Sequence, residues 1–232
     1  MLVHGFLGGS AQWALEASLS EGRALVAVDL PGFGKNADLA PEPSIAALAR
    51  WVLNHVTAPR FDLLGHSMGG MVVQEMVRHA PERVNKLVLY GTGSIGDMPG
   101  RFAPMATSQA RAKSAGAAAT ARRIAATWLK DGTASPAYPA IADIAEQASM
   151  AAMLAGFDAM QAWSGKDHLP HIAAETLVLW GELDRSYNWS QTEVLWQNIP
   201  NSHLAVLPHA AHAVHCDQPQ LFNGVVTDFL HR

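Results

Sequence analysis

The chain contains a serine in a sequence context typical of an enzymatic nucleophile. Ser67 is the centre of the motif Gly-His-Ser-Met-Gly at 65–69, which follows a short apolar run and precedes a helical pattern at 71–79. A strand that turns sharply into a helix needs small flanking residues, and Gly65 and Gly69 lack a Cβ atom. The pattern predicts a nucleophile elbow with an exposed Ser67 hydroxyl. The alternative is an ordinary glycine-rich turn with a buried serine.

Two backbone N–H groups are candidates for binding the oxyanion that forms when a serine attacks a carbonyl. The N–H of Met68 lies at the predicted start of the helix, where free donors meet the positive end of the helix dipole. The N–H of Phe6 lies in a glycine-rich loop at 6–10 after the first apolar segment. We expect these two groups to form an oxyanion hole.

A carboxylate and a histidine follow two later apolar runs. Asp184 comes just after the run at 176–181, and His212 comes just after the run at 203–207. The carboxyl ends of parallel strands share one edge of a sheet, so we expect both side chains to lie beside Ser67. In such a triad the histidine removes and returns a proton while the aspartate orients the imidazole. Glu182 is a second candidate for the acid, less well placed because it follows Gly181 immediately.

The elements that would position these residues alternate along the chain. Apolar runs typical of buried strands alternate with helical patterns at 44–55, 71–79 and 218–230. This alternation predicts an α/β fold with a mostly parallel sheet flanked by helices. Ala24–Leu30 is a continuous apolar run, which predicts a strand buried on both faces.

The middle of the chain lacks the apolar runs that predict strands elsewhere. From 94 to 165 the sequence is rich in alanine and helical in pattern, with interruptions at glycine and proline. We therefore predict a core formed by 1–93 and 166–232, with a helical cap, 94–165, inserted between two strands.

Composition excludes several classes of protein. The chain has 232 residues, 49% of them hydrophobic and 16% charged, and a net charge of −4, so no global nucleic-acid footprint is expected. No apolar run reaches the ~20 residues of a membrane span. The single cysteine, Cys216, excludes an internal disulfide and suits a cytoplasmic location. The sequence leaves the oligomeric state open.

Two other patterns in the sequence suggest rival sites. Residues 91–96 match the Gly-x-Gly-x-x-Gly pattern of dinucleotide-binding turns, but Pro99 and Gly100 oppose a helix after it. The spacing of His212 and His215 suggests a metal pair, yet no acidic or thiolate ligands complete it. We therefore predict neither a cofactor nor a metal.

Several sequence blocks of the chain resemble motifs of the α/β-hydrolase superfamily. They are His4-Gly5-Phe6-Leu7-Gly8-Gly9, Asp29-Leu30-Pro31-Gly32-Phe33-Gly34, residues 65–70, Gly181-Glu182-Leu183-Asp184 and His212. The resemblance is strongest to small carboxylesterases such as the pimeloyl-[acyl carrier protein] methyl ester esterases. It implies a serine esterase. A C–C bond hydrolase or lyase with the same triad is the alternative, and a ligand receptor on the same fold is the alternative from another class.

The resemblance also implies an antiparallel hairpin before the first strand, and the sequence has no residues for it ahead of Met1. The outer edge of the Ala24–Leu30 strand would then be bare and apolar. We expect either that the natural chain begins upstream of Met1, or that this edge is covered by a second copy of the chain or another segment.

The predicted cap contains a cationic segment. Residues 98–130 carry six Lys or Arg residues and no Asp or Glu. An anionic or carrier-linked small-molecule ester is one interpretation, and a solvated helix face is the other. We further expect an apolar pocket over Ser67, lined by Phe102, Met150, Met153, Phe157 and Trp163.

Overall fold

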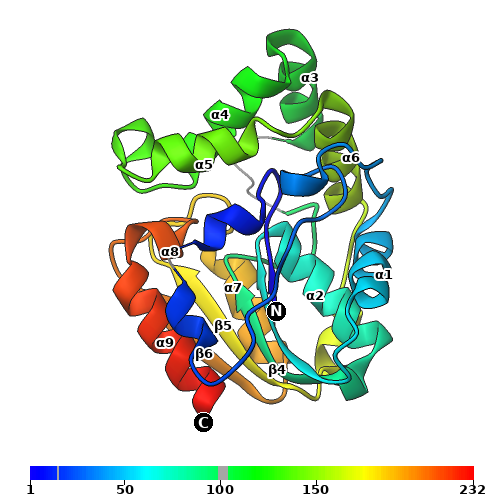
Figure 1. Ribbon diagram of the computed structural model, residues 1–232, viewed down its shortest axis with the longest axis vertical. Coiled ribbons are helices and arrows are strands. Elements are labelled where there is room, and N and C mark those ends of the chain that lie inside the picture. The colour runs from blue at the N-terminus through cyan, green and yellow to red at the C-terminus, as the bar shows by residue number, and fades with distance from the viewer. Residues whose placement is uncertain (15, 99–103) are drawn as a thin grey trace.

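The computed structural model describes residues 1–14, 16–98 and 104–232, and Figure 1 shows a sheet with helices on both sides. The described residues form one six-stranded sheet in the order β2-β1-β3-β4-β5-β6, and every neighbouring pair is parallel. The predicted α/β class with a parallel sheet is therefore confirmed. The strands are β1 (Leu2–Val3), β2 (Ala27–Val28), β3 (Phe61–His66), β4 (Val84–Tyr90), β5 (Glu175–Gly181) and β6 (Ser202–Leu207).

Helices of the core pack on both faces of the sheet. On one face α1 and α2 pack side by side, and apolar residues of α7 belong to the same hydrophobic cluster. On the other face α9 contributes Phe222, Val226 and Phe229 to a second cluster. The core helices are α1 (Ile45–His55), α2 (Met68–His79), α7 (Trp189–Asn198), α8 (Val214–Asp217) and α9 (Pro219–His231).

The register of the sheet brings several strand ends together. His66 at the end of β3 is opposite Tyr90 at the end of β4, and Tyr90 is opposite Leu179 of β5. Gly181 is in turn opposite Leu207 at the end of β6. Side chains that follow β3, β5 and β6 therefore start from neighbouring points on one edge of the sheet.

The prediction for Ala24–Leu30 was wrong in its length and burial. Only Ala27 and Val28 form the strand β2, and both are half-buried, while Val26 is exposed. The strand lies at the edge of the described sheet and pairs with β1 alone, so burial on both faces does not occur. Apolar composition alone could not distinguish this edge strand from a central one.

Among the described residues, four α-helices are inserted between β4 and β5. They are α3 (Met105–Ala115), α4 (Ala117–Thr127), α5 (Tyr138–Ala145) and α6 (Met150–Gln161). Figure 1 shows α3, α4 and α5 gathered beyond one end of the sheet, at the top of the view.

The two chain segments that enter and leave this insertion meet each other. Ile95 and Ser164 form an isolated antiparallel bridge. The N–H of Gly96 donates to the Trp163 carbonyl at 3.0 Å, and the N–H of Gly165 donates to the Ser94 carbonyl at 2.9 Å. We propose this crossing as the boundary of the cap, 94–165.

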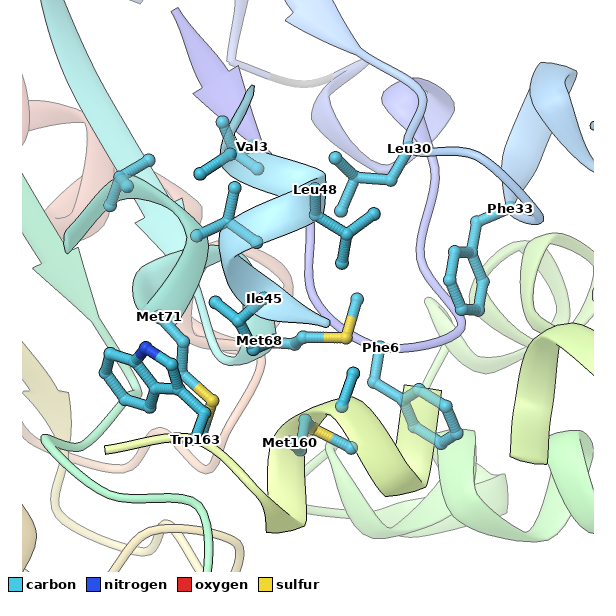
Figure 2. Packing of buried hydrophobic residues seen from close by; sticks show 14 of the residues in the cluster. Val3, Phe6, Leu30, Phe33, Ile45, Leu48, Met68, Met71, Met160 and Trp163 are labelled. Carbon is cyan, nitrogen blue, oxygen red and sulfur yellow. The ribbon is translucent and has the colours of Figure 1, made fainter. Parts of the chain in front are cut away.

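One hydrophobic cluster connects the core to α6 of the cap. Met68 and Ile45 belong to the core, and Met160 and Trp163 lie at the end of α6 and just after it. Figure 2 shows these side chains in one packed group, with Trp163 beside Met71 and Met160 near Phe6. Continuous apolar packing of this kind holds α6 against α1 and α2 of the core.

Candidate active site

Ser67 occupies a strained turn between β3 and α2. Its φ of 56° and ψ of −121° lie in a region that residues with side chains rarely adopt. A Cβ atom at Gly65 would overlap the backbone of Gly69, and one at Gly69 would overlap the backbone of Val3. The N–H of Ser67 donates to the Tyr90 carbonyl at 2.9 Å. This strand–turn–helix geometry is that of a nucleophile elbow, for the reason that the sequence predicts. The prediction of an exposed hydroxyl was wrong, because Ser67 is only 7% exposed and lines a cavity.

Asp184 and His212 form a buried ion-pair or hydrogen-bonded contact. Nδ1 of His212 lies 2.9 Å from Oδ2 of Asp184, and the two side chains are 2% and 0% exposed. The other carboxylate oxygen, Oδ1, accepts hydrogen bonds from the N–H groups of Ser186 at 2.7 Å and Tyr187 at 3.1 Å. These two bonds fix the carboxylate, so Oδ2 points at the imidazole. Glu182 is exposed, whereas Asp184 is buried.

The ring of His212 is held from several sides. The Tyr187 ring is stacked on it, with centroids 5.6 Å apart and planes at 14°. A Cβ atom at Gly91 would lie 3.3 Å from Nδ1 of His212. The first glycine of the motif at 91–96 therefore allows β4 to approach the Asp184–His212 pair closely, which gives this motif a structural role.

His66, the residue before Ser67, contacts the backbone of His212. Its Nε2 lies 3.1 Å from the His212 carbonyl oxygen. A carbonyl only accepts, so Nε2 of His66 carries the proton and donates it. Burial, and then the nearby His212 and His215, hold the pKa of His66 well below its ordinary value. His66 therefore acts as a neutral donor at neutral pH.

His215 is engaged with Tyr90 instead of forming a metal pair with His212. Its Nδ1 lies 3.0 Å from the Tyr90 hydroxyl, and its backbone N–H donates to the same hydroxyl at 3.2 Å. Burial lowers the pKa of His215 to about 3, so the ring is neutral. Among the described residues, no group of three or more His, Cys, Asp or Glu side chains is arranged to hold a metal ion.

The loop after β1 lies directly against Ser67. A Cβ atom at Gly5 would lie 2.9 Å from the Cβ atom of Ser67. His4 fixes this loop, because its Nδ1 lies 2.7 Å from the Gly5 carbonyl oxygen and its Nε2 accepts from the N–H of Leu30 at 3.0 Å. Burial lowers the pKa of His4 to about 4. The two residues predicted to form the oxyanion hole flank this region. Phe6 directly follows the hydrogen-bonded segment at His4 and Gly5, and Met68 is the first residue of α2.

A cavity of about 300 Å³ opens over these residues. Ser67, His212 and Phe6 line it together, and the rest of its wall comes from the cap and from the loop after Asp184. The further lining residues include Arg111, Arg123, Ile124, Trp128, Lys130, Phe157, Met160, Arg185 and Tyr187. Its size and mixed wall suit a small organic molecule.

Comparisons with known proteins agree with this architecture. The model of the alpha/beta hydrolase family matches residues 1–225. The chain belongs to the alpha/beta hydrolase family. It is 27% identical to a 2-hydroxy-6-oxononadienedioate/2-hydroxy-6-oxononatrienedioate hydrolase of Cupriavidus pinatubonensis, over 99% of this chain and 86% of that protein.

Solved structures share the fold of this hydrolase. A hydrolase from Pseudomonas aeruginosa PA01 superimposes with a TM-score of 0.87 at 25% identity, over 100% of this chain and 89% of that one. A thermophilic esterase from Thermogutta terrifontis superimposes with a TM-score of 0.86 at 24% identity, over 99% and 88% of the two chains. No helix within the described part of this hydrolase has the length and apolar character needed to cross a bilayer.

The residues predicted to line the pocket of the hydrolase lie in different places. Phe157 lines the cavity. Met153 is fully buried in the hydrophobic core, Met150 packs against the same core, and Trp163 donates its Nε1–H to Oε1 of Glu75 at 3.0 Å. These three side chains are used for packing and do not line the cavity. The prediction for Phe102 falls outside the described residues.

Sequence reasoning missed the residues that do form much of the wall. Trp128 and Ile124 come from α4 or its end, and Tyr187 and Arg185 directly follow the acid. The position of Arg185 and Tyr187 just beyond Asp184 was an available signal, since loops at strand ends form the sites of such sheets. Trp128 is one of several aromatic residues of the predicted cap, and residue type alone could not separate a pocket residue from a packing residue.

The cavity wall of the hydrolase carries only one sign of charge. Arg111, Arg123, Lys130 and Arg185 line it, and no Asp or Glu does so among the described residues. The neighbouring Arg122 is used otherwise, with NH1 3.2 Å from Asp143 and 2.7 Å from Glu146. Within the described part of the cationic segment, Arg111, Arg123 and Lys130 therefore line the cavity, while Arg122 is paired with two carboxylates outside it.

Proposed function

We propose that the chain is a serine hydrolase that cleaves a carboxylic ester through an acyl-enzyme. The observation that carries the proposal is the buried Asp184–His212 pair, whose histidine lines the same cavity as Ser67 at a strained elbow. The aspartate selects the tautomer of His212 with the proton on Nδ1, which leaves Nε2 free to accept the proton of Ser67.

The proposed reaction has two halves. The Ser67 oxygen attacks the ester carbonyl while His212 takes its proton, and the oxyanion is bound by the N–H groups of Phe6 and Met68. His212 then gives the proton to the departing alcohol. A water molecule, activated by the same histidine, attacks the acyl-enzyme and regenerates Ser67. No cofactor takes part in these steps.

The experiment combines turnover with covalent labelling. The wild-type chain should hydrolyse short and medium p-nitrophenyl esters and react with a fluorophosphonate, and mass mapping should place the label on Ser67. The Ser67→Ala variant should lose both activities. A label on another serine, or turnover that survives in the variant, would contradict the proposed nucleophile.

We further propose that the preferred ester carries an anionic group. The four cations on the cavity wall support this, because they lower the electrostatic energy of a negative charge near Ser67. A free carboxylate or phosphate and a carrier-linked phosphate present the same chemistry. The two sources are separated by measuring how strongly each inhibits hydrolysis of a neutral ester. One inhibitor is a free dicarboxylate monoester, and the other is the same monoester linked to a carrier.

Hydrolysis of a C–C bond on the same triad is the second candidate. The similarity to a 2-hydroxy-6-oxononadienedioate hydrolase favours it, as that substrate name describes a dianionic keto acid. The two candidates differ in their substrates. A 2-hydroxy-6-oxo-dienedioate should be consumed faster than p-nitrophenyl esters if C–C cleavage is the main activity, and much more slowly if ester hydrolysis is.

A ligand receptor on the same fold is the alternative of another class. It would gain thermal stability from its ligand and turn over simple esters negligibly, so rate measurements decide the matter. From the single cysteine we infer a reducing, cytoplasmic location for the enzyme.

A further inference from the structure

The peptide unit after His212 is held from two opposite sides. Its carbonyl, that of His212, accepts the hydrogen bond from His66 at the end of β3, at 3.1 Å. Its N–H, that of Ala213, donates to the carbonyl of Trp128 at 2.8 Å. Trp128 ends α4 of the cap and lines the cavity. One peptide plane thus joins the sheet, the proposed general base and the cap.

Asp217 makes a second connection between the same two segments. Its Oδ2 accepts from the N–H of Ala211, the residue before His212, at 2.9 Å. The same carboxylate accepts from the N–H of Lys130, at 3.1 Å to Oδ2 and 3.3 Å to Oδ1. Lys130, like Trp128, lines the cavity. The half-buried carboxylate therefore fastens the loop of the histidine to the cavity wall.

These bonds have a common mechanical effect. The backbone on both sides of His212, at Ala211 and Ala213, is bonded to the cap turn Trp128–Lys130 or to a side chain that holds it. A displacement of that turn must therefore move the imidazole or break hydrogen bonds. A shift of about 1 Å in a catalytic group can reduce the rate by about 100-fold.

We propose that Asp217 is a positioning residue that makes the cap turn Trp128–Lys130 and the His212 loop one unit. The proposal rests on the proposed role of His212 as the base. Asp217 does not line the cavity. It acts by holding two N–H groups that would otherwise lose their acceptor, one on each side of the boundary between cap and core.

The test compares Asp217→Ala and Asp217→Asn with Asp131→Asn. Asp131 is a matched control, as it is an exposed carboxylate that lies 3.5 Å from the Lys130 ammonium and accepts neither of the two N–H bonds made to Asp217. For a neutral p-nitrophenyl ester, Asp217→Ala should lower kcat about tenfold or more with KM within about twofold. Asp217→Asn, which keeps an acceptor oxygen, should lie between Asp217→Ala and wild type. Asp131→Asn should match wild type.

Hydrogen exchange supplies a readout that does not depend on turnover. In Asp217→Ala, peptides containing Lys130 and peptides containing Ala211 and Ala213 should lose protection together, while those from β4 and β5 keep it. Assays run well below each variant's melting temperature separate this effect from general instability. Should Asp217→Ala fail to fold, Asp217→Asn carries the same comparison.

Two results would overturn the inference. One is an unchanged kcat in an Asp217 variant whose amides at Lys130 and Ala211 have become exposed. The other is a loss of protection confined to one of the two segments. If the chain shows no ester turnover at all, the proposed function fails, whereas the exchange result still decides whether the two segments are coupled.

Discussion

At the scale of single residues, Ser67 combines an unfavourable backbone conformation with a useful position. A non-glycine residue with positive φ and extended ψ costs on the order of 1–3 kcal/mol. Hydrogen bonds on both sides of the residue hold it there, from its N–H to Tyr90 and from the Thr92 hydroxyl to its carbonyl at 2.7 Å. These hydrogen bonds, made by residues at and just after the end of β4, hold Ser67 in the strained conformation. In that conformation Ser67 lines the cavity.

Substitution of Asp184 tests the orientation of the base. Asp184→Asn keeps the shape of the side chain but can favour the wrong tautomer of His212, so kcat should fall by about 10³ to 10⁴. Ester turnover and the rate of fluorophosphonate labelling measure this loss. Glu182→Gln is the control and should retain activity. A near-normal rate in Asp184→Asn would mean that another group orients the histidine.

Adjacent arginines provide a matched test of anion recognition. Arg123 lines the cavity, while Arg122 is paired with Asp143 and Glu146. Arg123→Gln should lower kcat/KM about fivefold for an ester with a free carboxylate and leave a neutral ester unaffected. Added salt should reduce the wild-type preference in the same direction. Arg122→Gln should leave the preference intact, and equal effects of the two substitutions would argue against a specific anion site.

The residues of the proposed triad could be selected from the sequence because each follows a strand signal at a fixed place in the chain. Ser67, Asp184 and His212 needed only the order of strands and the rule that their ends share an edge. The cavity wall was harder to predict, because an apolar side chain such as Met153 suits a core and a pocket equally well. Only tertiary packing decides between the two.

At the scale of elements, the contact between α2 and β1 depends on a missing side chain. A Cβ atom at Gly69, in the first turn of α2, would overlap the carbonyls of Val3 and His4. This helix can therefore approach the sheet only with glycine at that point. The same approach places the helix N-terminus under Ser67.

Two glycine substitutions compare this contact with an open position. Gly69→Ala should lower the free energy of unfolding by about 1–3 kcal/mol, because backbone atoms must move. Gly224→Ala, in α9 where an added Cβ would meet nothing within 4 Å, should be neutral or raise it by about 0.5–1 kcal/mol. Urea unfolding curves measure both. A stable Gly69→Ala variant would show that α2 can move away from β1 at little cost.

Element boundaries followed the sequence closely where local signals were strong. Ser44 caps α1 by accepting the N–H of Ala47 at 3.1 Å, and the predicted helix at 44–55 forms as Ile45–His55. In α3 the only buried residues are Met105 and Ala112, so no apolar stripe existed to predict which side would pack. The arrangement of the cap therefore depends on contacts that local sequence does not encode.

At the scale of the whole molecule, several histidines are buried in neutral form. Burial lowers the pKa of His4 to about 4 and that of His215 to about 3, and it also lowers the pKa of His66. An unfolded histidine binds a proton below about pH 6.5. The unfolded state therefore takes up more protons than the folded state as the pH falls below that value.

Stability should consequently decrease in mild acid. The contribution of these histidines is complete above about pH 6.5 and is lost progressively as the pH falls towards their folded-state values. With a folded-state pKa of about 4 against 6.5, His4 alone should remove about 3 kcal/mol by pH 4. Urea unfolding at pH 7.5, 5.5 and 4.5 measures the slope. His4→Gln should flatten it, and a wild-type slope near zero would contradict neutral burial.

The antiparallel contact of Ile95 with Ser164 places both ends of the inserted segment side by side. The length between them can change without altering how β4 pairs with β5, because loop closure costs little more for a longer loop. An exchange of this segment between related enzymes could change the substrates accepted while the chemistry is kept. The graft would still have to offer a backbone N–H to Asp217 and a carbonyl to Ala213. Two main-chain hydrogen bonds, together with the apolar packing of α6 on the core, therefore set what a grafted segment must reproduce.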